Sequence, residues 1–260
     1  MPRGRIPEAW LPHVVALAAT SSSSPPLRGI DVFSGSSRYY KQMLKEGMLC
    51  ERMDVSIDQR HDVTKEAGVL VFIAAALRCV RGESLVVMGP PCSFFIATTS
   101  KHHGRTVKKP MGNGSPFAKQ GNRIATFISN AILLCAYLSL NVFIEQPSTS
   151  KLWHIFRVSQ SLASAMFRRV TWHLFVFGAR TPKPQNGWVA DENFARRFSA
   201  IAISLYRKTK KPSSRLFVRY DRTAKKKYRA NKNMRGSQVY PLKFVRTLIA
   251  LQFKQGDCEL

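Results

Sequence analysis

The chain has 260 residues and a formal net charge of +26, from 41 lysines and arginines against 15 aspartates and glutamates. This length and a hydrophobic content of 45% allow one substantial core and argue against two full domains. So large a positive charge attracts phosphate groups, which makes nucleic acid the expected partner. The five cysteines include no Cys-x-x-Cys pair, which argues against a zinc site or a disulfide framework, so no metal is predicted.

The first segment, residues 1–27, is predicted to be a flexible leader. Its apolar run at 10–19 is short and interrupted by a proline and a histidine, and four serines and two prolines follow it. Arg3 and Arg5 precede the run, so a targeting peptide is the alternative, and import into an organelle stays open.

Residues 28–55 follow the pattern strand, tight turn, helix, strand. We expect strands at 28–33 and 49–55 around a helix at 37–46, and a second helix at 64–79. The turn after the first strand contains one glycine and three serines. This pattern is the nucleotide-binding half of a doubly wound fold, in which a ligand approaches the turn and an acid on the second strand holds a ribose. A plain turn is the alternative interpretation.

The next strand, predicted at 84–88, ends in two prolines and a cysteine. Pro90 and Pro91 fix the backbone dihedrals and remove amide donors, so Cys92 is expected on a rigid loop at the end of a buried strand. A thiol held there is a candidate nucleophile, and a small buried hydrophobic side chain is the alternative. The loop at 100–115 is expected either to close over a base or to be a disordered basic surface loop.

The apolar stretch from Ile124 to Ile144 has the length of a membrane span, which is one interpretation of it. Its polar residues favour a division into a buried helix at 117–138 and a strand at 140–144 that carries Glu145 at its carboxyl end. The alternation of strands and helices predicts an α/β fold with a mainly parallel sheet. The carboxyl ends of parallel strands form one crevice, so the turn, the thiol and the carboxylate are expected there together.

The last third of the chain is strongly basic. We expect a strand at 169–177, a helix at 192–205 and a terminal helix at 241–252 that packs beside the turn after the first strand. Between these two helices, the segment 206–236 carries closely spaced lysines and arginines with interleaved tyrosines, which favours contact with phosphates and stacking on unpaired bases. A solvated basic loop is the alternative.

Of four short segments, the first three resemble the cofactor, nucleophile and carboxylate motifs of the cytosine-C5 DNA methyltransferase family, in the family's order. The Glu-Gln-Pro of the third and the whole of the fourth resemble a short, divergent branch of that family. The four segments are Phe33-Ser34-Gly35, Gly89-Pro90-Pro91-Cys92, Ile144-Glu145-Gln146-Pro147 and Ser237-Gln238-Val239-Tyr240-Pro241. The resemblance covers residues 28–252. It implies a Rossmann-like S-adenosylmethionine-dependent methyltransferase fold over this range, which includes the basic segment, and a tail at 253–260.

The resemblance also implies a reaction. In this family a thiolate adds to carbon 6 of cytosine and pushes electron density onto carbon 5, which then takes the methyl group of S-adenosylmethionine. Cys92 is implied to be the nucleophile, and Glu145 the acid that protonates or hydrogen-bonds ring nitrogen 3. The target base has to leave any duplex before this chemistry.

The cofactor residues are implied in the same way. They are Phe33, Ser34 and Gly35 at the methionine part of S-adenosylmethionine, Asp54 at the ribose, Val55 at the adenine ring and Asp62 at the adenine amino group. Glu51 is the alternative for the ribose, and a helix N-cap is the alternative role of Asp62.

Two departures from the family pattern keep another function open. The family's catalytic arginine motif is not clearly present, with Arg180 and Lys183 as candidates, and Ser36 and Ser37 stand where members often have a second glycine. A noncatalytic nucleic-acid-binding protein that retains the fold is therefore the alternative. We expect DNA rather than RNA as the partner, and the nucleus or another DNA-containing compartment as the location. We expect no membrane association, and the sequence gives no basis for inferring a protein partner.

Overall fold

The computed structural model describes residues 5–19, 24–179, 182–211, 217–218, 229–230 and 239–253. Its centre is a six-stranded sheet in the order β2-β1-β3-β4-β6-β5. The strands are β1 (Gly29–Val32), β2 (Cys50–Met53), β3 (Leu85–Met88), β4 (Asn141–Pro147), β5 (Arg168–His173) and β6 (Pro184–Val189). Neighbours from β2 to β4 are parallel, and β6 runs antiparallel to both β4 and β5. The predicted α/β class with a mostly parallel sheet is therefore confirmed.

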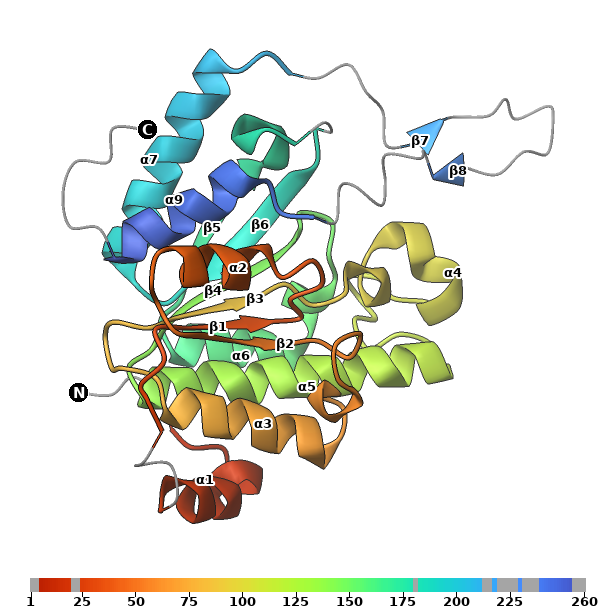
Figure 1. The fold of residues 1–260 in the computed structure, drawn as a ribbon. Helices are drawn as coiled ribbons and strands as arrows, with labels where there is room; N and C mark the ends of the chain where they lie inside the picture. Colours follow the sequence, from red (N-terminus) through yellow and green to blue (C-terminus); the bar gives the residue numbers. More distant parts are fainter. Residues whose placement is uncertain are drawn as a thin grey trace.

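Helices cover both faces of this sheet (Figure 1). One face carries α2 (Arg38–Lys45), α7 (Glu192–Lys208) and α9 (Leu242–Phe253), and the other carries α3 (Glu66–Leu77), α5 (Pro116–Tyr137) and α6 (Phe156–Ser164). Residues of β1 alternate between the layers, because Ile30 and Val32 join the core under α3 and α5 while Asp31 faces α2. The terminal helix α9 packs against α2, which follows the turn after β1, as predicted.

The order of the strands places a switch point between β1 and β3. The chain leaves the carboxyl end of β1 through α2 on one face and continues to β2, whereas it leaves the carboxyl end of β3 toward α5 on the other face and continues to β4. The two connections therefore diverge at the carboxyl ends of β1 and β3. Ligands of open α/β sheets bind at such a point. Backbone hydrogen bonds join the loops there, since Ser34 N donates to Met53 O at 3.1 Å and Gly89 N donates to Val32 O at 3.3 Å.

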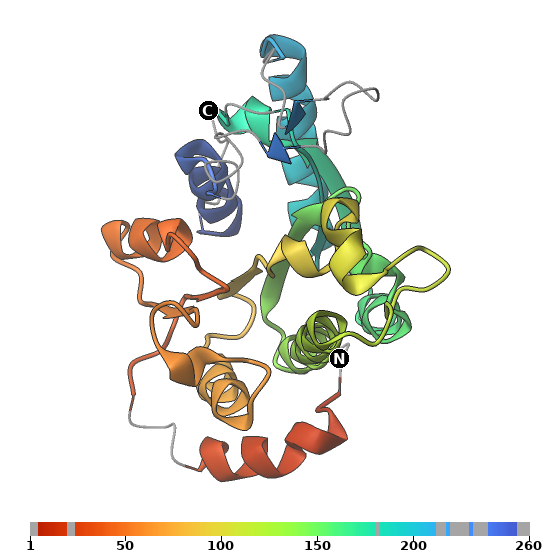
Figure 2. The same cartoon turned by 90° about the vertical axis from the view of Figure 1, so that its right-hand side faces the viewer.

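The leader prediction is wrong for residues 5–19, which form η1 (Glu8–Trp10) and α1 (Leu11–Ala18). Trp10 is buried, with its ring centroid 6.0 Å from that of Phe72 and 5.8 Å from that of Phe127. Pro12 lies in the first turn of α1, where the missing N–H leaves no hydrogen bond unmade. Figure 2 shows α1, in red, as the outermost helix on the α3 and α5 side of the sheet.

The remaining elements differ from the prediction at the far edge of the sheet. The strand predicted at 169–177 ends at His173, because the next four residues form a buried 3-10 helix, η7 (Leu174–Phe177). Helix α6 and strand β6 have no predicted counterpart. A short helix, α4 (Ser100–His103), precedes α5, and β7 (Phe217–Val218) pairs with β8 (Arg229–Ala230) outside the main sheet.

The apolar stretch at 124–144 divides between α5 and β4, as predicted. None of the helices in the described part of the chain has the length and hydropathy that a membrane span requires.

Candidate functional site

The turn after β1 has an unusual backbone. Phe33, Gly35 and Ser37 have φ of 61°, 47° and 55°, in the left-handed region. For Phe33 and Ser37 this conformation costs about 1 kcal/mol each, and such strain concentrates at functional sites. Ser37 is one of the two serines that follow Gly35, and its backbone adopts a conformation that favours glycine. A side chain at Gly35 would meet no atom within 4 Å, so this part of the turn is open.

Asp54 directly follows β2 and is hydrogen-bonded to the turn after β1. Its Oδ2 accepts a hydrogen bond from Gly35 N at 3.0 Å, and its Oδ1 accepts from Ser56 N at 2.9 Å and Ser56 Oγ at 2.6 Å. Val55, beside it, is 48% exposed. The alternative acid, Glu51, lies inside β2 and pairs with Arg78, just past the end of α3, at 3.9 Å. Of the two acids, only Asp54 is therefore at the carboxyl end of the sheet.

Asp62 stabilises the turn before α3. Its Oδ1 accepts from Thr64 N at 3.0 Å and from Thr64 Oγ1 at 2.7 Å, and its Oδ2 lies 3.6 Å from Lys65 Nζ. These contacts lower the pKa of the Asp62 carboxyl, although partial burial acts in the opposite direction. The N-cap of α3 is Lys65, so the predicted N-cap alternative for Asp62 is wrong, and its contacts instead hold the turn that precedes the helix.

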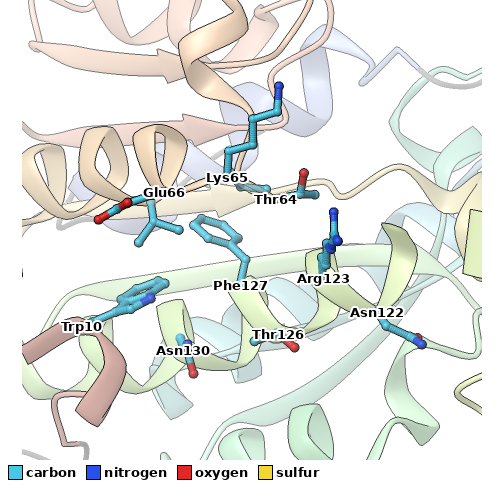
Figure 3. Close-up of a pocket in the computed structure, with 11 residues that line it drawn as sticks. Trp10, Thr64, Lys65, Glu66, Asn122, Arg123, Thr126, Phe127 and Asn130 are labelled. Carbon is cyan, nitrogen blue, oxygen red and sulfur yellow. The ribbon is translucent and has the colours of Figure 1, made fainter. Parts of the chain in front are cut away.

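A cavity of about 350 Å³ adjoins these residues, between the start of α3 and the first half of α5 (Figure 3). Val63 and Thr64, which follow Asp62, line it together with Phe127 of α5. The ring of Phe127 packs edge-on against Phe33, with centroids 6.1 Å apart. The cavity and the turn after β1 thus share Phe127 as a neighbour, although no residue of the turn lines the cavity. The volume of the cavity lies within the range of small-ligand sites.

Cys92 begins the 3-10 helix η4 (Cys92–Phe94) directly after Pro91 and is partly exposed. Burial raises the pKa of its thiol, the positive charge of Lys183 lowers it, and the negative charge of Glu145 raises it. The predicted nucleophile, the predicted acid and a lysine thus act on one another electrostatically. A nearby cation favours the reactive thiolate.

The loop after Cys92 is built around a buried arginine, so the alternative prediction of a disordered basic surface loop is wrong. The Arg105 guanidinium donates hydrogen bonds to the carbonyl oxygens of Phe94 at 2.8 Å, Ala118 at 2.9 Å and Pro110. His103 is also buried, and its Nδ1 accepts from Arg105 N at 3.0 Å. These bonds fix the loop against α5 and hold the segment that carries the thiol.

Glu145 lies within β4 and is 7% exposed. Burial raises the pKa of its carboxyl, while Lys183 and a hydrogen bond from Tyr240 lower it. The Tyr240 hydroxyl donates to Oε2 at 3.0 Å, whereas Oε1 is buried and has no hydrogen-bond partner among the described residues. A buried polar atom without a partner costs about 1–3 kcal/mol, so Oε1 is a candidate contact for a bound ligand.

Gln146 connects the carboxylate strand to the cysteine loop. Its Nε2 donates to the carbonyl oxygen of Pro90, and its Oε1 accepts from Ser150 Oγ at 3.0 Å. The side chain is 1% exposed. This bond gives a physical reason for a glutamine after the glutamate, because it sets the position of Cys92 relative to Glu145.

Sequence reasoning correctly placed Cys92 after the end of β3, whereas Glu145, expected at the end of its strand, lies within β4, two residues before its last residue. It assigned no role to Gln146 or Tyr240. Gln146 and Tyr240 both lie inside segments that carry the family resemblance, and this position was the one indication in the sequence that they belong to the site. Lys183, one of the two candidates for an arginine in the resembled family, acts electrostatically on both the thiol and the carboxyl and lowers the pKa of each. Three predicted features lie outside the described residues, wholly or for the most part: Arg180, the Ser237-Gln238 pair and the basic segment 206–236.

No protein-family model matches the sequence, and no curated protein matches it either.

Proposed function

We propose that the protein transfers a methyl group from S-adenosylmethionine to carbon 5 of cytosine in nucleic acid, with DNA as the expected polymer. The observation that carries this proposal is the grouping of Cys92, Glu145 and Lys183 at the carboxyl ends of the strands beside the switch point. In this proposal the α/β domain is a Rossmann-like methyltransferase fold.

The residues around the turn after β1 fit S-adenosylmethionine. The turn is open at Gly35, Val55 offers an exposed apolar surface, and Phe33 contacts Phe127, which lines a cavity of suitable volume. Phe33, Ser34 and Gly35 would hold the methionine part, Asp54 the ribose, and Val55 and Asp62 the adenine. S-adenosylmethionine supplies an electrophilic methyl group on a sulfonium. Binding at Asp54 requires its carboxylate to exchange or share the hydrogen bonds from Gly35 and Ser56.

The chemistry of the protein's own groups begins at Cys92. Its thiolate forms a bond to carbon 6 of cytosine, and the ring electron pair moves to carbon 5, which takes the methyl group. Glu145 gives its proton to ring nitrogen 3 as negative charge develops there. As the methyl group moves to carbon 5, its bond to the sulfonium breaks, which leaves S-adenosylhomocysteine as a neutral thioether. Loss of the carbon 5 proton to solvent then expels the thiolate, and nitrogen 3 returns its proton to Glu145, which restores the neutral aromatic ring. Burial of Glu145 supports this role because it favours the protonated carboxyl.

Lys183 supplies the positive charge that the thiolate needs. It lowers the pKa of Cys92 and opposes the effects of burial and of Glu145 on the thiol. In this proposal a lysine thus takes the electrostatic part of the family's arginine, without its planar, bidentate geometry.

The test is methyl transfer from radiolabelled S-adenosylmethionine to DNA and, separately, to RNA, followed by digestion to nucleosides. We expect label in 5-methylcytosine with the wild type and none with Cys92→Ala. Cys79→Ala is the matched control, because Cys79 is a buried cysteine whose pKa burial raises to about 12 and which takes no part in the reaction. A folded wild type that labels neither polymer but still binds nucleic acid would replace this proposal with the noncatalytic one.

A further inference from the structure

We propose that Tyr240 is a positioning residue that directs the proton of Glu145 to Oε1, the oxygen left free for the target base. This inference rests on the proposed function, and it adds a residue and a recognition step to it. Among the described residues that face the carboxyl, only Tyr240 donates a hydrogen bond to it.

The direction follows from the hydrogens available. A phenol has one hydroxyl hydrogen, and that of Tyr240 is donated to Oε2 at 3.0 Å. Burial and the charge of Glu145 raise the pKa of Tyr240 well above its ordinary value, so the hydroxyl stays protonated and remains a donor. The phenol oxygen could also accept a hydrogen bond, but the described residues offer the Tyr240 hydrogen no acceptor other than Glu145, so Oε2 remains the acceptor oxygen when the carboxyl is neutral. The acid proton of Glu145 therefore resides on Oε1, which has no partner among the described residues.

A proton on Oε1 matches cytosine. Ring nitrogen 3 of cytosine carries a lone pair and accepts a hydrogen bond, whereas nitrogen 3 of uracil or thymine carries a hydrogen. A carboxyl held as a donor at Oε1 therefore favours cytosine, and it is already oriented to transfer its proton when the thiolate adds. A carboxyl whose proton occupies either oxygen has a weaker preference for cytosine over uracil.

Three contacts hold Tyr240 in this position. Arg38 Nη1, at the start of α2, donates to the Tyr240 carbonyl oxygen at 2.9 Å, and the tyrosine ring packs on Phe244 with centroids 5.3 Å apart. The hydroxyl lies against Gly89, where a Cβ would come within 2.2 Å of the oxygen. Gly89 is the first residue after β3, so the absence of a side chain there lets the tyrosine reach Glu145.

The charged and titratable groups around this pair are few. Lys183 acts electrostatically on Glu145 and on Cys92. Cys92 and Asp31 act electrostatically on Tyr240. The hydrogen bond from Tyr240 stabilises the ionised carboxylate and lowers the pKa of Glu145. Removal of the hydroxyl alone should therefore raise the pKa of Glu145 while Lys183 and Cys92 stay in place.

The experiment combines Tyr240→Phe with an infrared titration of the carboxyl C=O band, assigned to Glu145 by its loss in Glu145→Gln. We expect the midpoint of this band to move to higher pH in Tyr240→Phe. We also expect methyl transfer to cytosine to fall about tenfold, and the rate ratio between cytosine and uracil substrates to narrow. Tyr39→Phe is the matched control, because it removes another buried hydroxyl, which donates to Leu85 O at 3.0 Å, and it should leave both midpoint and ratio unchanged.

Gly89→Ala provides a second route to the same state if Tyr240→Phe folds poorly. Its methyl group displaces the hydroxyl, so it should reproduce the infrared shift, and the double variant Gly89→Ala/Tyr240→Phe should lose little more activity than either single variant. An active wild type whose Glu145 midpoint does not move in either variant would overturn the positioning role alone. A wild type that methylates no cytosine would remove the proposed function, and with it any catalytic meaning of the Tyr240 hydrogen bond.

Discussion

Asp31 offers a quantitative test of the electrostatics beneath the turn after β1. This residue of β1 is 2% exposed, and its Oδ2 accepts a hydrogen bond from Tyr40 N at 3.2 Å. Burial raises the pKa of its carboxyl from 3.8 to about 7, and the Tyr40 amide and the charge of Arg52 offset only part of that effect. The folded protein therefore binds this proton more tightly than the unfolded chain does.

The free energy of unfolding should consequently decrease as the pH rises from about 4 to about 7. Each pKa unit corresponds to about 1.4 kcal/mol, so Asp31 should remove about 3 kcal/mol of stability between pH 5 and pH 8. Asp31→Asn keeps an acceptor for Tyr40 N and cannot ionise, so it should be more stable than the wild type at pH 8 and lose this part of the pH dependence.

The assay is urea unfolding of the wild type and Asp31→Asn at several values from pH 5 to pH 8. The difference in the free energy of unfolding between the two proteins isolates Asp31, because Glu145 is present in both and its pH dependence cancels. Asp58→Asn is the control for charge, since Asp58 is paired with Arg60 and its pKa of about 2 lies below this pH range. Parallel curves for wild type and Asp31→Asn would refute the argument, because they would mean that Asp31 is ionised in the folded protein throughout.

Other substitutions test separate parts of the site. Lys183→Met should raise the pKa of the Cys92 thiol, so alkylation of Cys92 by iodoacetamide should slow at a given pH, and an unchanged rate would contradict the electrostatic contact. Gln146→Leu leaves the Pro90 carbonyl without its donor and should lower the free energy of unfolding by about 1–3 kcal/mol in urea titrations, whereas a neutral effect would count against the bridge between the strands. Ser37→Gly should stabilise the protein by about 1 kcal/mol in the same assay, because glycine adopts the left-handed conformation without strain, and a loss of stability would show that the serine side chain is required.

The elements that carry the site could be predicted because each has a local signal. Strand β3 is an apolar run followed by Gly89 and two prolines, β4 has an apolar first half and ends at Pro147, and β1 precedes the small-residue turn at 34–37. Helix α5 begins at Ser115-Pro116, a cap followed by a proline that suits the first helical turn. Strand β6 lacks such a signal, since it contains polar residues and Gly187. That glycine is explained only by a distant contact, because a Cβ there would come within 2.9 Å of the Trp172 ring.

The candidate site was predictable to the level of its strand ends and no further. The sequence placed Cys92 and Glu145 at the ends of neighbouring strands, but Tyr240 lies 95 residues beyond Glu145, and only the packing of α9 against α2 brings it to the carboxyl. The buried role of Arg105 was missed for a similar reason. A loop rich in lysine and glycine has the composition of a disordered segment, and the carbonyl oxygens that bind Arg105 converge only in the fold.

A covalent adduct on Cys92 tests the central claim most directly. DNA that contains 5-fluorocytosine has no proton to lose from carbon 5 after methyl transfer, so the thiolate cannot be expelled and the adduct persists. We predict that protein incubated with this DNA and S-adenosylmethionine will yield a methylated 5-fluorocytosine adduct on the peptide that contains Cys92, detected by mass spectrometry, and that no adduct will form with Cys92→Ala. Methyl transfer to cytosine without such an adduct, or an adduct on a different residue, would contradict the account.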